Sequence, residues 1–428
     1  MKSSSFRFQV VREVPEPLGL FFRPGRADHT TLNQLVSENR IGMTGAVFDP
    51  CHAAFQETLR SGLWTRDLYT VLDPLAMEIA TTNGFTPQRS KLPWAGARPH
   101  RPADFDSKTV DRMAAMIAEW VSKHDFNAVL APCHYIERGI DDPWLLVDRR
   151  LTTQLRMRLD EAGCKEVAMY YPLATSTKVF FNGEVRNRLA DILAAMPLDG
   201  VWLRIHPIGS QSGDTVMQHY ILGCQDFHRR GLSLTAEKTG ALGLALLAFG
   251  AVSAIESGIS SGEQFNFRRL IAAPKKGPVF SARPRVYVSS LGTFLSRKDA
   301  VEFFANPKFI QYACRDTDCC RRGHESMTTN PRRHFANTKM EEIALLGATP
   351  ERLRPDTYLQ RIVRPAGNNL TRVLASSKLS EVLRGALERK QRRLHGWDAT
   401  LTELNRSHLL KTFCPPLKRH ILHTRATA

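Results

Sequence analysis

VWLRIHP (residues 201–207), LSLTAEKTG (232–240) and AVSAIE (251–256) are three apolar runs that end in polar residues, and helical patterns at 215–230 and 240–249 separate them. Strands that alternate with helices of this length are joined by parallel crossovers, which bury each strand on both faces. This stretch therefore predicts an α/β fold built on a parallel sheet.

The same alternation extends outward, from about residue 42 to about residue 305. The expected strands are 44–49, 69–73, 128–133, 167–171, 201–206, 232–237, 251–256 and 286–290. A count of eight favours a closed (β/α)8 barrel of the TIM type, although an open doubly wound sheet would give nearly the same pattern. We therefore expect an N-terminal lead-in at 1–40, a barrel at 41–305 and a Cys/His-containing, basic helical C-terminal region at 306–428.

Polar side chains stand at the carboxyl ends of the expected strands, where barrel enzymes carry their active sites. Alternation along a strand places Arg204 and His206 on one face, and charged groups on strands buried on both sides are costly unless paired or used. The candidate site residues are Asp49, Asp73, His134, Arg204, His206, Glu237, Glu256 and Ser289. Such a set can support acid–base or nucleophilic chemistry, or bind a divalent metal. The simpler interpretation is that strands become polar where loops begin.

The balance of charged residues indicates which partners the protein is expected to bind. The chain has 59 Lys and Arg against 42 Asp and Glu, a formal net charge of +17. Nucleic acid is the first partner to expect from this charge, although a general solubility effect gives the same balance. Lys and Arg are dense from Arg384 onward, either as a solvated helix face or as an appendage that contacts phosphates.

The apolar stretches of the sequence indicate the cellular compartment to expect for the protein. The first residues lack the unbroken apolar run of a signal peptide, and the longest apolar stretch, 240–255, is shorter than a membrane-spanning helix. We expect a cytoplasmic protein with no membrane partner, and homo-oligomerisation stays open.

Three of the eight cysteines fall within seven residues, in the stretch CRDTDCCRRGHESMTTNPRRHF (314–335). Closely spaced thiols followed by a histidine are the ligands of structural Zn²⁺. The candidate ligands are Cys314, Cys319, Cys320 and His334. Because the spacing is not a standard CxxC pair, a cluster of reduced thiols without a metal is the alternative.

A barrel followed by a Cys-rich segment and by a histidine on a helix of the type HFANTKMEEIALL resembles the tRNA-guanine transglycosylase superfamily, including relatives that insert deazaguanine bases into DNA. The detailed resemblance covers roughly residues 250–346. Cys314 and Cys319 have the separation of the family's first and third zinc cysteines, and His334 takes the place of the helix histidine. Asp316 stands where the middle cysteine is expected, so Cys320 would have to substitute for it.

The resemblance also implies catalytic roles. Glu256 stands where the family has its nucleophilic aspartate, after the seventh expected strand, and Asp73 stands near the family's other catalytic aspartate. VLDPLAMEI around Asp73 lacks the glycines of the family's DSGGF motif, which help to accommodate the base. The resemblance therefore implies a divergent branch with altered chemistry, in which Arg204, His206 and Glu237 recognise the substrate and Zn²⁺ is structural.

Three functional hypotheses follow. The first is a transglycosylase-like enzyme that acts on a nucleic-acid base, by base exchange or related N-glycosidic chemistry, with Asp73 and Glu256 as catalytic residues. The second is a barrel enzyme of another class, a hydrolase or lyase, on a small anionic substrate. The third is a non-catalytic nucleic-acid-binding barrel, whose mouth would be plugged by apolar side chains with Glu237 and Glu256 held in internal salt bridges.

Overall fold

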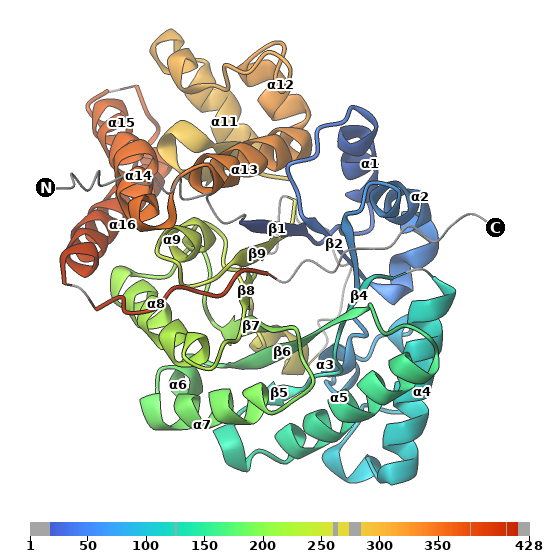
Figure 1. Cartoon of the computed structure of the whole chain (residues 1–428). Helices are drawn as coiled ribbons and strands as arrows, with labels where there is room; N and C mark the ends of the chain where they lie inside the picture. Colours follow the sequence, from blue (N-terminus) through green and yellow to red (C-terminus); the bar gives the residue numbers. More distant parts are fainter. Residues whose placement is uncertain are drawn as a thin grey trace, which may run out of the picture.

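A closed barrel of eight parallel strands forms the centre of the protein (Figure 1). The computed structural model describes residues 18–124, 126–259, 264–273, 284–376, 378–407 and 409–417. The barrel strands, in order around the sheet, are β1 (Gly19–Phe22), β2 (Gly45–Phe48), β3 (Tyr69–Leu72), β4 (Ala128–Leu130), β6 (Ala168–Ser176), β7 (Gly200–His206), β8 (Leu234–Glu237) and β9 (Ala254–Ser257). Pairing of β9 with β1 closes the sheet, and the short β5 (Tyr135–Ile136) pairs with the end of β6. The predicted TIM-type barrel is confirmed.

Helices on the outside of the barrel cover its strands (Figure 1). They are α1 (His29–Ser37), α2 (Ala53–Trp64), α4 (Ser107–Lys123), α5 (Pro143–Glu161), α6 (Thr177–Phe180), α7 (Gly183–Ala194), α8 (Asp214–His228) and α9 (Leu242–Ala248). The single turns α3 (Ala76–Ile79) and α10 (Arg268–Ile271) lie in the segments that follow β3 and β9. Every residue of α9 is buried, which explains the apolar stretch at 240–255. Among the described residues, no helix combines the length and the apolar character needed to cross a membrane.

Two expectations about the strands are wrong. The first barrel strand is β1, inside the expected lead-in at 1–40, and the expected eighth strand at 286–290 lies outside the barrel. That run forms β10 (Val286–Val288), which pairs antiparallel with β11 (Thr293–Leu295). Gly292 has a φ of +57°, a conformation that glycine adopts without strain, and it lies in the turn that joins β10 to β11. The barrel therefore begins near residue 19 rather than residue 41.

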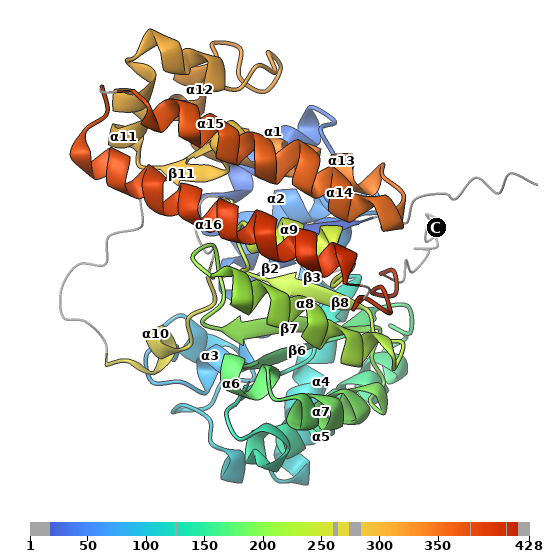
Figure 2. The same cartoon turned by 90° about the vertical axis from the view of Figure 1, so that its left-hand side faces the viewer.

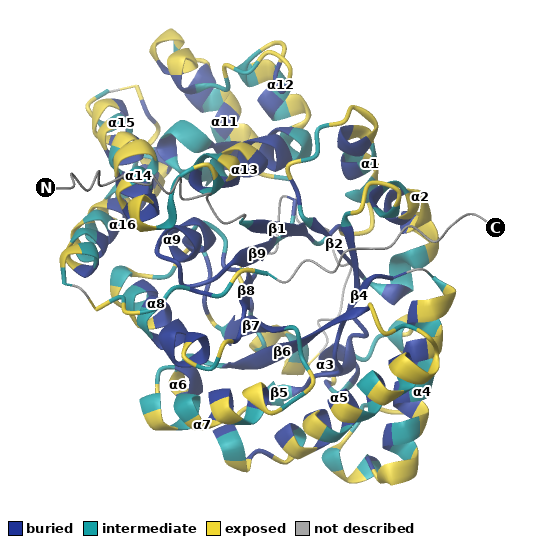
Figure 3. Cartoon of the chain, in the orientation of Figure 1, coloured by how far each residue is buried: buried dark blue, intermediate teal, exposed yellow. Residues whose placement is uncertain are grey.

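A helical layer after the barrel packs against one side of it (Figure 2). Its helices are α11 (Arg297–Phe304), α12 (His324–Thr329), α13 (Pro331–Gly347), α14 (Arg354–Tyr358), α15 (Arg364–Leu374) and α16 (Glu381–Arg406). Contacts of α13 and α14 with α9, and of α16 with α8, fix this layer to the barrel. Figure 3 shows that the exposed residues lie on the outer faces of the helices, while the strands are buried.

Candidate functional site

The barrel interior has two layers, an apolar layer and a charged layer, because side chains on a strand alternate with a period of two. Interior residues of four strands belong to one apolar cluster: Phe21, Val71, Trp202 and Ala254. Two positions later along the same chain segments stand Arg23, Asp73, Arg204 and Glu256. The charged side chains are therefore one step closer to the carboxyl mouth than the apolar cluster.

Two arginines hold three carboxylates together in this charged layer. Arg204 donates from Nε to Glu237 Oε2 and from Nη2 to Asp73 Oδ2, both at 2.5 Å. Arg23 contacts all three acids: Nη1 lies 2.8 Å from Asp73 Oδ2, Nη2 lies 3.4 Å from Glu237 Oε2, and Nε lies 3.3 Å from Glu256 Oε1. We call these five residues the mouth network. Four of the eight candidate site residues, Asp73, Arg204, Glu237 and Glu256, therefore lie together.

The acids of the mouth network differ in their ionisation. Burial opposes the ionised form of Asp73 and of Glu237, but the charges of Arg204 and Arg23 outweigh it and hold the pKa of each below its usual range. Burial raises the pKa of Glu256 from 4.5 to about 7, because Arg23 offsets the loss of water only in part and Glu237 repels a second negative charge. One acid near neutrality beside two ionised ones is an arrangement suited to proton transfer.

His134 lies between β4 and β5, and its imidazole contacts Asp148, a residue that the sequence interpretation missed. Its Nδ1 lies 2.6 Å from Asp148 Oδ1, and the Tyr171 hydroxyl donates to Asp148 Oδ2 at 2.8 Å. The imidazole stacks on Trp144 with 3.7 Å between ring centroids. Asp148 thereby favours a proton on Nδ1 and leaves Nε2, which is buried and has no hydrogen-bond partner among the described residues, as the acceptor.

The remaining candidates do not join the mouth network by any contact found among the described residues. Asp49 follows β2 and accepts a hydrogen bond from the Cys51 backbone, which caps a short turn. His206 ends β7 and is half-buried, and burial lowers its pKa. Ser289 follows β10 outside the barrel sheet, so the reason for choosing it, the end of an eighth barrel strand, does not hold.

Arg23 is the second residue that the sequence interpretation missed. The run LGLFFRP (18–24) carries the available signal, a short apolar strand followed by a charged residue. The expected lead-in at 1–40 covers this run, whereas the structure places it in β1 with Arg23 directly after the strand.

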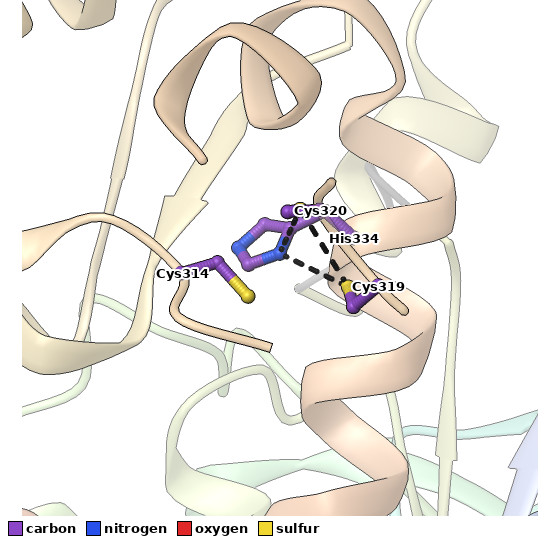
Figure 4. A group of neighbouring side chains, drawn as sticks. All are labelled: Cys314, Cys319, Cys320 and His334. Carbon is purple, nitrogen blue, oxygen red and sulfur yellow. Dashed lines mark hydrogen bonds between the residues drawn. The ribbon is translucent and has the colours of Figure 1, made fainter. Parts of the chain in front are cut away.

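The cysteine segment forms a compact group with His334, shown in Figure 4. The ligand atoms of Cys314, Cys319, Cys320 and His334 all lie within 4.8 Å of one another. His334 Nδ1 is 3.6 Å from Cys319 Sγ and 3.4 Å from Cys320 Sγ. Three thiols and one imidazole nitrogen converging on one point could bind a metal ion, and this donor set is one that tetrahedral Zn²⁺ uses.

The residues around the cysteine group orient its histidine for metal binding. His334 Nε2 donates to the Tyr287 carbonyl oxygen at 2.9 Å, so the lone pair of Nδ1 faces the thiols. Hydrogen bonds from the Cys319 and Cys320 thiols lower the pKa of Cys314 well below its usual range, and the same hydrogen bonds to Cys314 raise the pKa of Cys319 and of Cys320. Without a metal the group therefore favours one thiolate, on Cys314, with two thiols as its donors. Tyr287 belongs to β10, so the strand expected in the barrel instead supports the histidine.

Comparisons with known proteins add little to this description. No family model matches the chain, and no curated protein sequence matches it. A GH10 xylanase from Bispora sp. MEY-1 in complex with xylobiose is similar in structure, with a TM-score of 0.38 and 10% identity over 57% of this chain and 83% of that chain. The carboxyl transferase domain of Rhizobium etli pyruvate carboxylase has a TM-score of 0.38 and 8% identity over 92% of this chain and 61% of that chain. At these values the matches carry no functional argument, and the barrel is established by the strand pairing of this chain itself.

Proposed function

We propose that this protein is a divergent transglycosylase-like enzyme that breaks and remakes the N-glycosidic bond of a nucleic-acid base. The observation that supports this proposal is the unequal ionisation of Asp73 and Glu256 at the carboxyl mouth of the barrel. Breaking an N-glycosidic bond needs negative charge near the sugar carbon and a proton for the leaving base, and two carboxyl groups of different pKa supply both.

The electrostatics assign the two roles. Asp73 stays ionised beside Arg204 and Arg23, so it attacks or stabilises the positive charge that develops at the sugar carbon. Glu256 gives its proton to the departing base and takes a proton from the incoming base, which restores the starting state. Arg204 fixes the position of Asp73 and is itself held by Glu237. His206, the more exposed group, contacts the substrate.

The cysteine group has a structural part in this proposal. Zn²⁺ held by Cys314, Cys319, Cys320 and His334 would cross-link the loop after the barrel to α13 and supply no step of the reaction. The match of this donor set to the ligands implied by the family resemblance also supports the proposal. The net charge of +17 supports RNA or DNA as the partner.

A non-catalytic barrel that binds nucleic acid is the second candidate. The pairing of Glu237 with Arg204, Arg23 and Lys238 favours it, because a buried ion network of this kind can be purely structural. Glu256 argues for the enzyme, since its Oε2 has no hydrogen-bond partner among the described residues.

Base exchange distinguishes the two candidates. Labelled guanine and deazaguanine are incubated with the protein and with RNA or DNA, and incorporation into polymer is measured for the parent, for Glu256→Gln and for Asp73→Asn. We expect each substitution to lower the rate at least 100-fold, whereas Ser289→Ala, outside the barrel, leaves it unchanged. Glu256→Gln keeps the shape of the side chain, so loss of activity without a fall in melting temperature identifies a chemical role. Full activity in both variants would falsify the assignment.

A further inference from the structure

A basic pocket of about 210 Å³ lies beside the carboxyl mouth of the barrel, away from the mouth network. Arg389, Lys390 and Arg393 of α16 line it together with Arg285, which precedes β10. Its lining among the described residues contains no acidic side chain. Four positive charges around one small cavity repel each other, so the pocket favours an anion.

The position of the pocket connects it to the site. Ser210, in the loop that follows β7, and Ala241, in the loop that follows β8, also line it. These strands end at His206 and Glu237, so both loops leave the same end of the barrel as the mouth network. Loops at the carboxyl end of such barrels commonly form phosphate sites.

Arg393 has an unusual set of partners for a half-buried arginine. Its Nη1 donates to the Ser210 carbonyl at 3.2 Å, and its Nη2 donates to Gln211 Oε1 at 2.6 Å. Both oxygens are neutral, whereas Arg186 and Arg364 pair with aspartates. Burial and the charge of Arg389 lower the pKa of Arg393, which reflects positive charge without a nearby counter-charge.

Lys390 adds a buried cation to the same wall. It is only 7% exposed, and its ammonium lies 5.4 Å from the centre of the Trp397 ring. By contrast, Arg332 and Arg333, which line a second pocket next to α12, pair with Asp28 and Glu38. Arg332 and Arg333 are thus already paired with carboxylates, whereas the contacts recorded for Arg393 among the described residues are to two neutral oxygens.

We propose that the α16 pocket binds a backbone phosphate of the nucleic-acid substrate, next to the nucleotide whose base enters the barrel mouth. The choice of a polynucleotide rests on the proposed function, and the phosphate chemistry rests on the pocket. A phosphate there contacts the guanidinium groups of Arg389 and Arg393, whose fork geometry matches phosphate oxygens.

The test measures nucleic-acid binding rather than base exchange. Fluorescence anisotropy of labelled RNA and DNA oligonucleotides is titrated at several salt concentrations for the parent, for Arg389→Gln/Arg393→Gln, and for Arg372→Gln/Arg392→Gln. The second pair removes the same charge from exposed positions of α15 and α16 that do not line the pocket. We expect the pocket pair to weaken binding at least tenfold more than the control pair. The slope of log affinity against log salt should fall by about 0.7 to 0.9 for each lost phosphate contact.

Two further variants keep the result interpretable. Arg389 is exposed, so Arg389→Gln alone should fold normally and still weaken binding. Loss of base exchange in Glu256→Gln tests the proposed function, and loss of binding in the pocket pair tests this inference, so the two failures are separate outcomes. Equal loss in the pocket pair and the control pair would overturn the inference. A second result would also overturn it: inorganic phosphate stabilises the protein only when Arg389 and Arg393 are present, while oligonucleotide affinity does not depend on these two arginines. The ligand of the pocket would then be a free phosphate compound.

Discussion

The Nε of Arg23 lies 3.3 Å from Oε1 of Glu256, while Oε2 of the same carboxyl has no hydrogen-bond partner among the described residues. Asp73 and Glu237 each contact both Arg204 and Arg23, whereas Arg23 is the one arginine recorded within 4 Å of Glu256 in the described part of the chain. Because the acid with the fewest cationic partners is the hardest to ionise, Glu256 is the group of the mouth network that changes charge near neutral pH.

The stability of the protein should depend on pH through Glu256. Its pKa is raised from 4.5 to about 7, so between these values the folded state holds a proton that the unfolded state has released. The stabilisation from this group is therefore complete below pH 4.5 and is lost as the pH rises toward 7. Glu256→Gln cannot ionise, so we expect it to gain on the order of 2–3 kcal/mol relative to the parent between pH 5 and pH 8. Denaturant unfolding of both proteins at each pH measures this difference, and a constant difference would contradict the raised pKa.

Activity should fall above pH 7 if Glu256 must carry a proton to the leaving base. The rate of base release from RNA or DNA, measured under single-turnover conditions, should drop about tenfold for each pH unit above the pKa. A nucleophilic Glu256 would give the opposite slope, with activity rising through neutral pH. The direction of the pH profile thus decides between the assignment from electrostatics and the role implied by family resemblance.

Arg23 should stabilise the mouth network, since it contacts all three acids. Arg23→Gln leaves buried carboxylates with less counter-charge, and we expect a loss of about 3–5 kcal/mol in the free energy of unfolding. Arg26→Gln, at an exposed position three residues away, is the matched control and should change stability by less than about 0.5 kcal/mol. Similar values for the two variants would show that the network is not a stabilising unit.

The cysteine group should bind about one equivalent of Zn²⁺. Cys320→Ser removes one of the four candidate ligands, so metal content should fall sharply and the melting temperature should drop. Cys164→Ser, a half-buried thiol elsewhere in the chain, should retain the metal. Elemental analysis of the three purified proteins measures the outcome. A parent protein free of metal at full stability would instead support a reduced thiol cluster.

Asp148 should orient His134, because it accepts hydrogen bonds from the backbone N–H of His134 and from the Tyr171 hydroxyl and also contacts His134 Nδ1. Asp148→Asn replaces one acceptor oxygen with a donor at a fully buried position, and we expect a loss of about 2–4 kcal/mol. Asp141→Asn, an exposed control nearby, should be neutral. The 15N chemical shifts of the His134 imidazole, which report which ring nitrogen carries the proton, should also change in the Asp148 variant, because Asp148 contacts Nδ1.

The sequence by itself determined the layered pattern inside the barrel. Alternation along VWLRIHP and LSLTAEKTG puts Arg204 and Glu237 at strand ends, because the period of two is a local property of extended backbone. The sequence also predicted that Cys314, Cys319, Cys320 and His334 come together, because a short loop can bring thiols close without support from the core.

Only the tertiary structure decided which run closes the barrel. GLFF at 19–22 and VYV at 286–288 both have strand composition, but only β1 pairs with β2 and with β9, whose first residue is Ala254. Closure joins Gly19 to Ala254, far apart in the chain, and no local propensity encodes that pairing. Arg23 and Asp148 entered the site for the same reason: each is placed by contacts with distant residues rather than by its own neighbours in the sequence.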